Sequence, residues 1–502
     1  MPPARWVCSG MTDGSERLSG LVSRSAVNFA GLIVGTAAQF GVVLVLTRTL
    51  APSQAGVFLI GYAIFRIAVS LFGFGTNIAG IRYVALARGT ARQQSERDAA
   101  RTVLILAAVG GILGAILLGA LSTEIERVFH APGLRDTLWY LGYGLPLSTF
   151  TLAAGGVLRG ASRTASAIVV DQVLENGLRL AGLIAGLSAT GTATGAAIGF
   201  TAGGIASSLS AATLSHEFWR RASFLSGSEL SELLRFSAYQ WGTILTGTAL
   251  LWADSVLLGL WKSPADVAVY SAATRAIWLG MVFVLPIGMA FQPMIAELGA
   301  VGDFARLRDL YRTATRLSTA IACPPLLLTG VCAEPLLRAL YGDKYAAGAT
   351  ALSFLAVGQA VNAAVGPAGQ VITMLGRTDV TFWLNSVGLV SNVGLNSVLS
   401  PEYGITGAGA AWCLSLVVLC ILRLVQCRSE IGIKIRDAWL IRVGIAITAG
   451  VCVSAAIVIA ADGRPAVVTA EAFVVGLATA YGGMALLGRR PRMSRGSISQ
   501  RA

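Results

Sequence analysis

The sequence predicts an all-α, polytopic membrane protein with about fourteen transmembrane helices, and three observations support this fold class. Hydrophobic residues make up 55% of the 502 residues and charged residues only 13%. The mean hydropathy of +0.71 lies outside the range of soluble globular domains. Apolar stretches of about 18 residues or more recur along the chain, and alternate connections between them differ strongly in charge.

The apolar stretches define the expected helices in order, each placed to within about three residues at either end. They cover residues 26–47, 55–79, 102–122, 137–158, 165–188, 194–214, 236–259, 268–295, 313–333, 348–374, 379–399, 406–426, 439–461 and 466–487.

The distribution of basic residues predicts the orientation of these helices. The N-terminal tail, the even-numbered connections and the C-terminal tail hold 26 of the 38 Lys and Arg residues, whereas the other connections hold 7. By the positive-inside rule both termini are expected in the cytoplasm, with the chain in a bacterial-type plasma (inner) membrane. Most of the net charge of +13 therefore comes from the connections and tails that are expected in the cytoplasm, and nucleic acid is not an expected partner.

The two ends of the chain fit this topology. The polar segment 1–24 lacks an apolar core, so we expect a cytoplasmic tail and not a signal peptide, with Met11 as an alternative start. The basic C-terminal tail, 488–502, carries Arg489, Arg490 and Arg492 and is expected to lie against anionic lipid headgroups.

Cysteine and histidine positions predict neither a metal site nor a cofactor. The seven cysteines lie mostly inside apolar stretches, without the paired spacing of a disulfide framework or a zinc site. The two histidines, His130 and His216, lie in connections far apart in the sequence.

An internal repeat explains twelve of the expected helices. Residues 51–58 recur as residues 263–270, at an offset of 212, and each copy joins the first helix of its half to the second. Residues 194–196 recur as residues 406–408 at the same offset. Six helices per repeat is an even number, so both halves have the same orientation. The expected organisation is an N-lobe (25–214), a cytoplasmic linker (215–235), a C-lobe (236–426) and two appended helices (439–487).

Three ionisable residues stand out in the fifth expected helix. Asp171, Glu175 and Arg179 follow one another at four-residue spacing and so share one face of an α-helix. Charges at depth in a bilayer cost a few kcal/mol or more, so this face must contact protein or a wet cavity. The alternative for Glu175 and Arg179 is a static ion pair that locks the helix, and for Asp171 simple hydration near the cytoplasmic end.

Other buried charges lie at comparable depths. Arg66 and Arg179 are roughly 14 to 16 Å from the outer ends of their helices, near the midplane. Asp254 and Arg275 are about 8 to 10 Å from the outer ends of two helices that form a hairpin, so they could form a static ion pair. Arg423, like Arg442, lies close enough to a cytoplasmic helix end to snorkel.

Several short segments carry a family resemblance through their order and spacing. They are the two Pro-centred turns, Asp254 in the seventh expected helix, residues 297–316 with Gly302-Asp303, residues 341–345 (YGDKY), residues 375–378 (LGRT) and residues 403–408 (YGITGA). Together they resemble the polysaccharide or lipid-linked oligosaccharide flippases of the multidrug/oligosaccharidyl-lipid/polysaccharide exporter superfamily.

The resemblance implies two six-helix lobes that form a V around a central cavity, open alternately to either side of the membrane. It implies a transporter and not an enzyme, which moves a polyprenyl-(pyro)phosphate-linked oligosaccharide from the cytoplasmic to the outer leaflet for cell-surface polysaccharide biosynthesis. The expected partners are the lipid-linked glycan and membrane lipids, with a polysaccharide polymerase or glycosyltransferases as further candidates.

Such a substrate assigns candidate roles to the buried polar residues. Arg66, Arg179 and Arg275 are candidates for the headgroup phosphate, because a guanidinium binds oxyanions bidentately and stays charged at low dielectric. Asp171, Glu175 and Asp254 are candidates for proton or sodium coupling. Amide side chains are candidates for sugar hydroxyls or, alternatively, for hydrogen bonds between helices. They are Gln39, Gln240, Gln359, Asn362, Gln370, Asn385, Asn392 and Asn396.

Three alternative functions remain open at this point. A multidrug or cation antiporter of the same superfamily would share the fold, but three buried arginines favour an anionic substrate. A membrane glycan polymerase or ligase usually carries long catalytic outer loops, whereas the outer connections here reach only about fourteen residues. A transport-inactive scaffold for cytoplasmic partners has no long soluble domain to support it.

Overall fold

The computed structural model describes residues 14–89, 93–219, 223–281, 285–433, 474–482 and 484. Every regular element in these residues is a helix. Eight of the described helices are long and apolar enough to cross a membrane, or nine if one bent pair counts as a span. The prediction of an all-α, multi-pass membrane protein is confirmed.

The first half of the chain forms one group of helices, which we call the N-lobe. Its elements are α1 (Gly14–Thr49), α2 (Pro52–Phe72), α3 (Thr76–Gly89), α4 (Gln93–Phe129), α5 (Leu134–Gly160), α6 (Thr164–Ile168), a π-helix (Val169–Leu174), α7 (Glu175–Thr190) and α8 (Ala193–Leu214), followed by the short α9 (His216–Trp219).

The second half forms the C-lobe. Its elements are α10 (Gly227–Trp261), α11 (Pro264–Ala276), α12 (Trp278–Met281), α13 (Leu285–Val301), α14 (Phe304–Val331), α15 (Ala333–Tyr341), a 3-10 helix (Asp343–Gly348), α16 (Ala349–Val365), α17 (Ala368–Met374) and α18 (Thr378–Ile431).

The first twelve expected spans all coincide with helical structure, but their number and bounds change. The second span breaks at residues 73–75 and the tenth at Gly366–Pro367, whereas the eleventh and twelfth merge in α18 across a break at Gly404. The backbone of Gly404 has φ 54 and ψ −129, which only glycine adopts without strain. The thirteenth span, 439–461, lies outside the described residues, and the fourteenth is described only at 474–482 and 484.

Two helices extend well beyond their apolar stretches. α4 covers 37 residues where the sequence predicts 102–122, and α10 begins at Gly227, inside the predicted linker 215–235. The start of α10 is fixed by a capping box, in which the Ser226 N–H and hydroxyl both donate to Glu229 Oε2 at 3.2 and 2.8 Å. Helices of this length project beyond a hydrocarbon core of about 30 Å.

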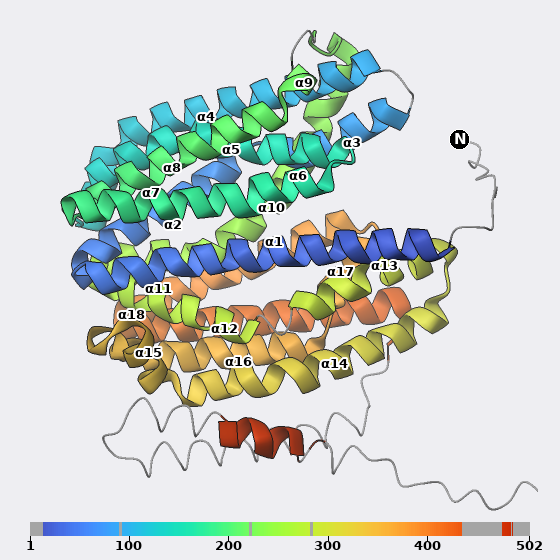
Figure 1. Cartoon of the computed structure of the whole chain (residues 1–502). Coiled ribbons are helices and arrows are strands. Elements are labelled where there is room, and N and C mark those ends of the chain that lie inside the picture. Colours follow the sequence, from blue (N-terminus) through green and yellow to red (C-terminus); the bar gives the residue numbers. More distant parts are fainter. Residues whose placement is uncertain are drawn as a thin grey trace, which may run out of the picture.

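The other helices of the N-lobe and the C-lobe lie on either side of α1 and diverge toward one end of the molecule (Figure 1). At the other end they meet, where α2 and α11 both begin. We call this the turn end, because it carries the two Pro-centred turns of the internal repeat. The opposite end, with the starts of α4, α10 and α14, is the basic end.

The turn end is closed by direct contact between the two copies of the repeat. α2 and α11 pack so closely that a Cβ added at Gly56 would lie 1.6 Å from the carbonyl oxygen of Pro264. Arg48, at the end of α1, donates from Nε to the Leu340 carbonyl of α15 at 2.6 Å and from Nη2 to the Ala339 carbonyl. The described conformation is therefore joined at this end.

The lobes are also joined along α2 and α10. The indole N–H of Trp241 donates to the Leu71 carbonyl at 2.8 Å, and the hydroxyls of Ser70 and Thr248 lie 2.8 Å apart. The break after α2 lets α10 approach, since a Cβ at Gly75 would lie 2.7 Å from the Ser237 carbonyl oxygen.

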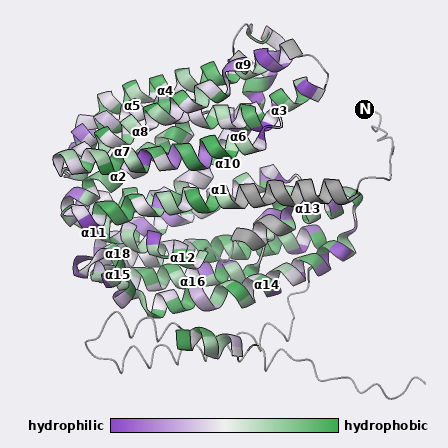
Figure 2. Ribbon diagram, in the orientation of Figure 1, coloured by the Kyte–Doolittle hydropathy of each residue, from purple (hydrophilic) through white to green (hydrophobic). Residues whose placement is uncertain are grey.

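The outer surface fits a lipid environment. Large apolar side chains such as Leu209 (63% exposed) and Ile116 (65%) face outward from the long helices. Figure 2 shows apolar residues along the helices and polar residues gathered at their ends, around α3, α9 and the start of α14.

A short helical segment of the C-terminal region packs against α14. Pro325 has no N–H for the carbonyl of Ile321, four residues earlier. The Tyr481 hydroxyl donates to that carbonyl at 2.9 Å and replaces the missing donor.

Candidate functional site

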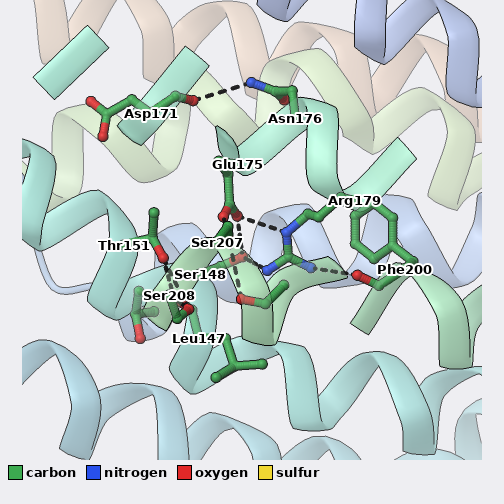
Figure 3. A network of polar contacts seen from close by, with 12 residues as sticks. Leu147, Ser148, Thr151, Asp171, Glu175, Asn176, Arg179, Phe200, Ser207 and Ser208 are labelled. Atoms are coloured by element: carbon green, nitrogen blue, oxygen red, sulfur yellow. Dashed lines mark hydrogen bonds and ion pairs between the residues drawn. The ribbon is translucent and has the colours of Figure 1, made fainter. Parts of the chain in front are cut away.

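A network of buried polar residues fills the centre of the N-lobe (Figure 3). Arg179 donates from Nε to Glu175 Oε1 at 2.8 Å and from Nη2 to the Ser148 hydroxyl at 2.6 Å. Glu175 also accepts from Ser148 at 2.9 Å and from the Ser207 hydroxyl of α8 at 2.6 Å. The guanidinium lies over the ring of Phe200, with 4.6 Å from its carbon to the ring centroid.

This geometry holds Arg179 inside the N-lobe, and its role as a headgroup ligand stays a prediction. Its side chain is buried inside one lobe, at 3% exposure, and its Nε and Nη2 have partners. A Cβ at Gly204 of α8 would lie 2.7 Å from Nη2, so the small residue makes room for the guanidinium. Arg179 and Glu175 form the ion pair that the alternative expects in this conformation. Breaking a buried pair would leave an uncompensated charge.

Asp171 belongs to a different cluster from Glu175, although both were expected on one helical face. Asp171 lies inside the π-helix Val169–Leu174, and Glu175 begins α7 directly after it. The wider π turn changes the angle between the two side chains around the helix axis. Asp171 Oδ2 pairs with Nη1 of Arg159 on α5 at 2.5 Å, and the residue is 7% exposed. It is therefore buried and paired, and simple hydration is wrong.

The π-helix also connects to α1 through amide side chains. Asn176 donates to the backbone carbonyls of Asp171 and Gln172 at 3.1 and 3.0 Å, and accepts from Gln39 of α1 at 3.2 Å. Gln39 thus acts between helices in this conformation, as the alternative for the amide residues predicts.

Arg66 lies at the boundary between the lobes. It lines a cavity of about 180 Å³, which we call the inter-lobe cavity, together with residues of α2, α3 and α5 and with Ile244 and Thr248 of α10. Its Nε is buried and has no hydrogen-bond partner among the described residues. A guanidinium with an unused donor beside a cavity is able to bind an anionic ligand.

Arg275 lies near Arg66, on the opposite lobe. Its guanidinium carbon is 4.8 Å from the ring centroid of Trp252 and 5.9 Å from that of Trp278. Trp252 also packs edge-on against Tyr62 of α2, with ring centroids 5.3 Å apart. Tyr62 lies one helical turn before Arg66 on α2, so this contact places Arg275 near Arg66. The structure thus brings two of the three predicted arginines together and separates the third.

Asp254 does not pair with Arg275. The Tyr270 hydroxyl donates to Asp254 Oδ2, and the backbone N–H of Ser255 donates to Oδ1 at 2.9 Å. No ion pair joins the carboxylate to Arg275 in the part of the chain that the structure describes, so the predicted static pair is wrong. Asp254 is a buried carboxylate, 2% exposed, held by neutral donors.

The remaining amide residues divide into two groups. Asn392 and Asn396 are fully buried between the two halves of α18, where Asn392 donates to the Ser415 hydroxyl at 3.1 Å and Asn396 donates to the Asn392 carbonyl at 3.0 Å. Asn392 thus links the two halves of α18, whereas Asn396 bonds within its own half, and neither lines a cavity described here. Their role as sugar ligands stays a prediction. Gln240 is half-buried, with its Cβ beside Gly75 at the lobe boundary.

The second group lies around cavities in the C-lobe. Asn362 donates to Gln359 Oε1 at 3.2 Å and accepts from the Cys420 thiol at 3.6 Å, and it lines a cavity with Gln370. Asn385 accepts from Arg423 Nη2 at 3.2 Å beside an adjoining cavity. Among the described residues, no group of three His, Cys, Asp or Glu side chains could hold a metal ion.

The comparison with protein families decides the family. The family model described as "Polysaccharide biosynthesis protein" matches residues 21–299, more than half of the chain. The chain belongs to this family. A second model, described as "MatE", matches residues 243–398, and the resemblance to the multidrug/oligosaccharidyl-lipid/polysaccharide exporter superfamily is confirmed.

Curated relatives of this chain are named as flippases or transporters. "Probable flippase AglR" of Haloferax volcanii is 26% identical over 193 residues, 38% of this chain and 40% of AglR. A Shigella flexneri protein provisionally named as an O-antigen transporter is 22% identical over 414 residues, 80% of this chain and 96% of its own length. The match therefore spans about two fifths of the first relative. Proteins with these names are not enzymes.

Solved structures show the same fold at low sequence identity. The structure described as "Lipid II flippase MurJ, inward closed conformation" has a TM-score of 0.73 at 13% identity, covering 93% of this chain and 98% of MurJ. An inward-facing multidrug resistance MATE family transporter has a TM-score of 0.68 at 18% identity, covering 81% and 98%. At these identities the likeness shows the fold of this chain and nothing more.

Sequence reasoning missed several residues of these sites. Arg159, the partner of Asp171, lies on α5, and Tyr270, the partner of Asp254, lies on α11. Neither stands at the four-residue spacing that predicts an ion pair within one helix. Arg423 was expected to snorkel, but its side chain turns inward to Asn385. The signal that could have found Tyr270 is its position in the repeat, at the end of the Pro-centred segment 263–270.

Proposed function

We propose that this protein is a flippase that moves a polyprenyl-(pyro)phosphate-linked oligosaccharide from the cytoplasmic to the outer leaflet of a plasma membrane, for cell-surface polysaccharide biosynthesis. The observation that carries the proposal is the pair of arginines at the lobe boundary. Arg66 and Arg275 come from opposite lobes, on helices that meet where Trp252, under Arg275, packs against Tyr62, and neither has a carboxylate ion pair among the described residues. Two like charges across this boundary repel each other, and an anion between them would relieve the repulsion.

The position of the arginines fits a phosphate headgroup better than a cationic drug. A phosphate bound by two guanidiniums replaces repulsion with attraction, and the planar forks allow bidentate hydrogen bonds. A cation would add to the repulsion, so the antiporter alternative is disfavoured. The inter-lobe cavity also offers the hydroxyls of Ser70, Thr149 and Thr248 and the amide of Asn77, which suit sugar hydroxyls.

The contacts at the turn end support an alternating-access cycle. With the orientation expected from the basic residues, the turn end faces the outside and the described conformation is closed there. Release of the glycan would then require the contacts between α2 and α11, and those of Arg48 with α15, to break. Phosphate binding at Arg66 and Arg275 draws the lobes together and favours occlusion.

Asp254 is the coupling residue that fits this scheme best. Asp171 and Glu175 are each held by an arginine in the N-lobe, whereas Asp254 has only neutral donors. Binding of a proton or sodium ion at Asp254 would disturb its hydrogen bond with Tyr270, in the α11 segment that contacts α2. Transport that continues at full rate after the proton and sodium gradients are collapsed would exclude this coupling.

The function is tested by depleting the protein from cells and measuring lipid-linked glycan on each leaflet. Depletion is expected to trap intermediates on the cytoplasmic leaflet. Arg66→Gln and Arg275→Gln should each fail to relieve the accumulation, whereas Arg428→Gln, at an exposed position near the end of α18, should relieve it. Near-normal transport by both Arg66→Gln and Arg275→Gln would refute the role of the arginine pair.

A further inference from the structure

A second polar site lies inside the C-lobe, apart from the arginine pair. Two adjoining cavities, of about 240 and 120 Å³, share the lining residues Gly369, Gln370 and Arg423. They lie among α13, α14, α16, α17 and both halves of α18, in the half of the lobe nearer the basic end. Arg66 and Arg275 line neither of them. We call this site the Arg423 pocket.

Arg423 is a cation without a counter-charge. Its Nη2 donates to Asn385 Oδ1 at 3.2 Å, and no acidic side chain among the described residues pairs with it. The guanidinium lies against the backbone of Gly369, where an added Cβ would be 3.5 Å from both Cζ and Nε. Instead of reaching for the basic end, the side chain turns toward the pocket, so its remaining donors are available to a ligand.

The other lining groups are neutral and polar. The carboxamides of Gln292, Gln370 and Asn362 and the hydroxyls of Thr373 and Thr381 line the two cavities. Carboxamides and hydroxyls both donate and accept hydrogen bonds, which suits the hydroxyls of a sugar. No carboxylate lines either cavity, so nothing there favours a cationic ligand.

We propose that the Arg423 pocket binds an acidic sugar residue of the transported glycan, with the carboxylate on Arg423 and the ring hydroxyls on the surrounding amides. The inference rests on the proposed function and deepens it, because it places a second anionic group in the substrate besides the headgroup phosphate. A guanidinium pairs with a carboxylate through two parallel N–H···O bonds, and one sugar ring brings several hydroxyls to a pocket of this composition. The same chemistry, an oxyanion on a hydroxylated group, also occurs in the headgroup of phosphatidylglycerol.

Binding is tested with the full-length protein in phosphatidylcholine nanodiscs, by thermal unfolding in the presence of glucuronate, glucose or inorganic phosphate. Glucuronate is expected to raise the Tm, and glucose to leave it unchanged. In Arg423→Gln the affinity for glucuronate should fall at least about tenfold, the usual effect of losing a hydrogen-bonded charge. The control Arg428→Gln removes an exposed arginine of the same helix, and should respond as the wild type does.

Asn385→Asp separates ligand binding from folding. The new carboxylate would lie beside Arg423 and neutralise it, so this variant should fold at least as well as the wild type and lose the response to glucuronate. An equal glucuronate shift in all variants, or none in the wild type, overturns the proposal. A shift that only inorganic phosphate produces overturns the assignment to a carboxylated sugar.

The lipid source is tested by adding phosphatidylglycerol to the nanodiscs. Stabilisation by this lipid that depends on Arg423, without any response to glucuronate, would identify a lipid site and overturn the proposal. In a flipping assay, Arg423→Gln should lower transfer of an acidic lipid-linked glycan about tenfold relative to a neutral one, and Arg66→Gln should lower both. If the wild type moves neither glycan, the proposed function fails while glucuronate binding still reports on the pocket.

Discussion

Closure of the turn end depends on a glycine, and Gly56→Ala tests this directly. The added Cβ would lie 1.6 Å from the Pro264 carbonyl oxygen and 2.3 Å from its carbon. Since carbon and oxygen atoms approach to about 3.3 Å at the closest, the helices must separate by about 1.7 Å. Both atoms belong to backbone, so a change of side-chain rotamer cannot relieve the overlap.

The expected effect is a shift from the closed to the open turn end. A gap of this size removes most of the dispersion attraction between α2 and α11, where Ala55, Val267 and Ala268 are buried. Overpacking of this kind costs about 1 to 3 kcal/mol, which changes the ratio of closed to open molecules by about 5- to 150-fold.

Spin labels at two exposed positions, Thr49 on α1 and Arg338 on α15, report the separation of the lobes at this end. In Gly56→Ala the distribution of label distances should move to longer values. Gly177→Ala is the matched control, because a Cβ there would meet nothing within 4 Å. If both variants keep the wild-type distribution while remaining folded, the glycine contact does not control closure.

Three further predictions concern stability, measured by thermal unfolding in nanodiscs. Glu175→Ala should destabilise the protein by about 3 to 5 kcal/mol because Arg179 is left buried and unpaired, and the added change Arg179→Met should recover much of the loss; equal Tm values for the single and double variants would contradict this. Asn392→Ala should cost about 1 to 3 kcal/mol while flipping per folded molecule stays normal; impaired flipping would support Asn392 as a sugar ligand. Tyr481→Phe should cost about 0.5 to 1.5 kcal/mol, whereas Tyr403→Phe, at a position 61% exposed, should cost nothing measurable.

Much of the fold follows from sequence because apolar length and charge asymmetry are strong signals in a membrane protein. The Pro-centred turns at residues 51–58 and 263–270 were predicted to join the first and second helices of each half, and α2 and α11 begin at Pro52 and Pro264. The ends of α4 and α10 could not be predicted from apolar stretches, because the terminal turns of these helices are polar and continue the helix beyond the apolar stretch.

The site was harder to predict, because contacts depend on register and on the packing of distant helices. Reading Asp171, Glu175 and Arg179 as one stripe assumes 3.6 residues per turn throughout, and the π-helix at Val169–Leu174 breaks this assumption. The position of Arg423 in the sequence is equally compatible with a side chain that snorkels to the membrane surface and with one that faces inward. Only the position of Asn385, 38 residues earlier, shows which direction it takes.

The contact between Gly56 and Pro264 ties the two halves of the chain together. It joins two copies of one segment, so it resembles a homodimer interface, in which each surface must fit its own duplicate. By the repeat offset of 212, Gly56 corresponds to Ala268 and Pro52 to Pro264. A substitution on one side of this contact must therefore fit the corresponding segment of the other half.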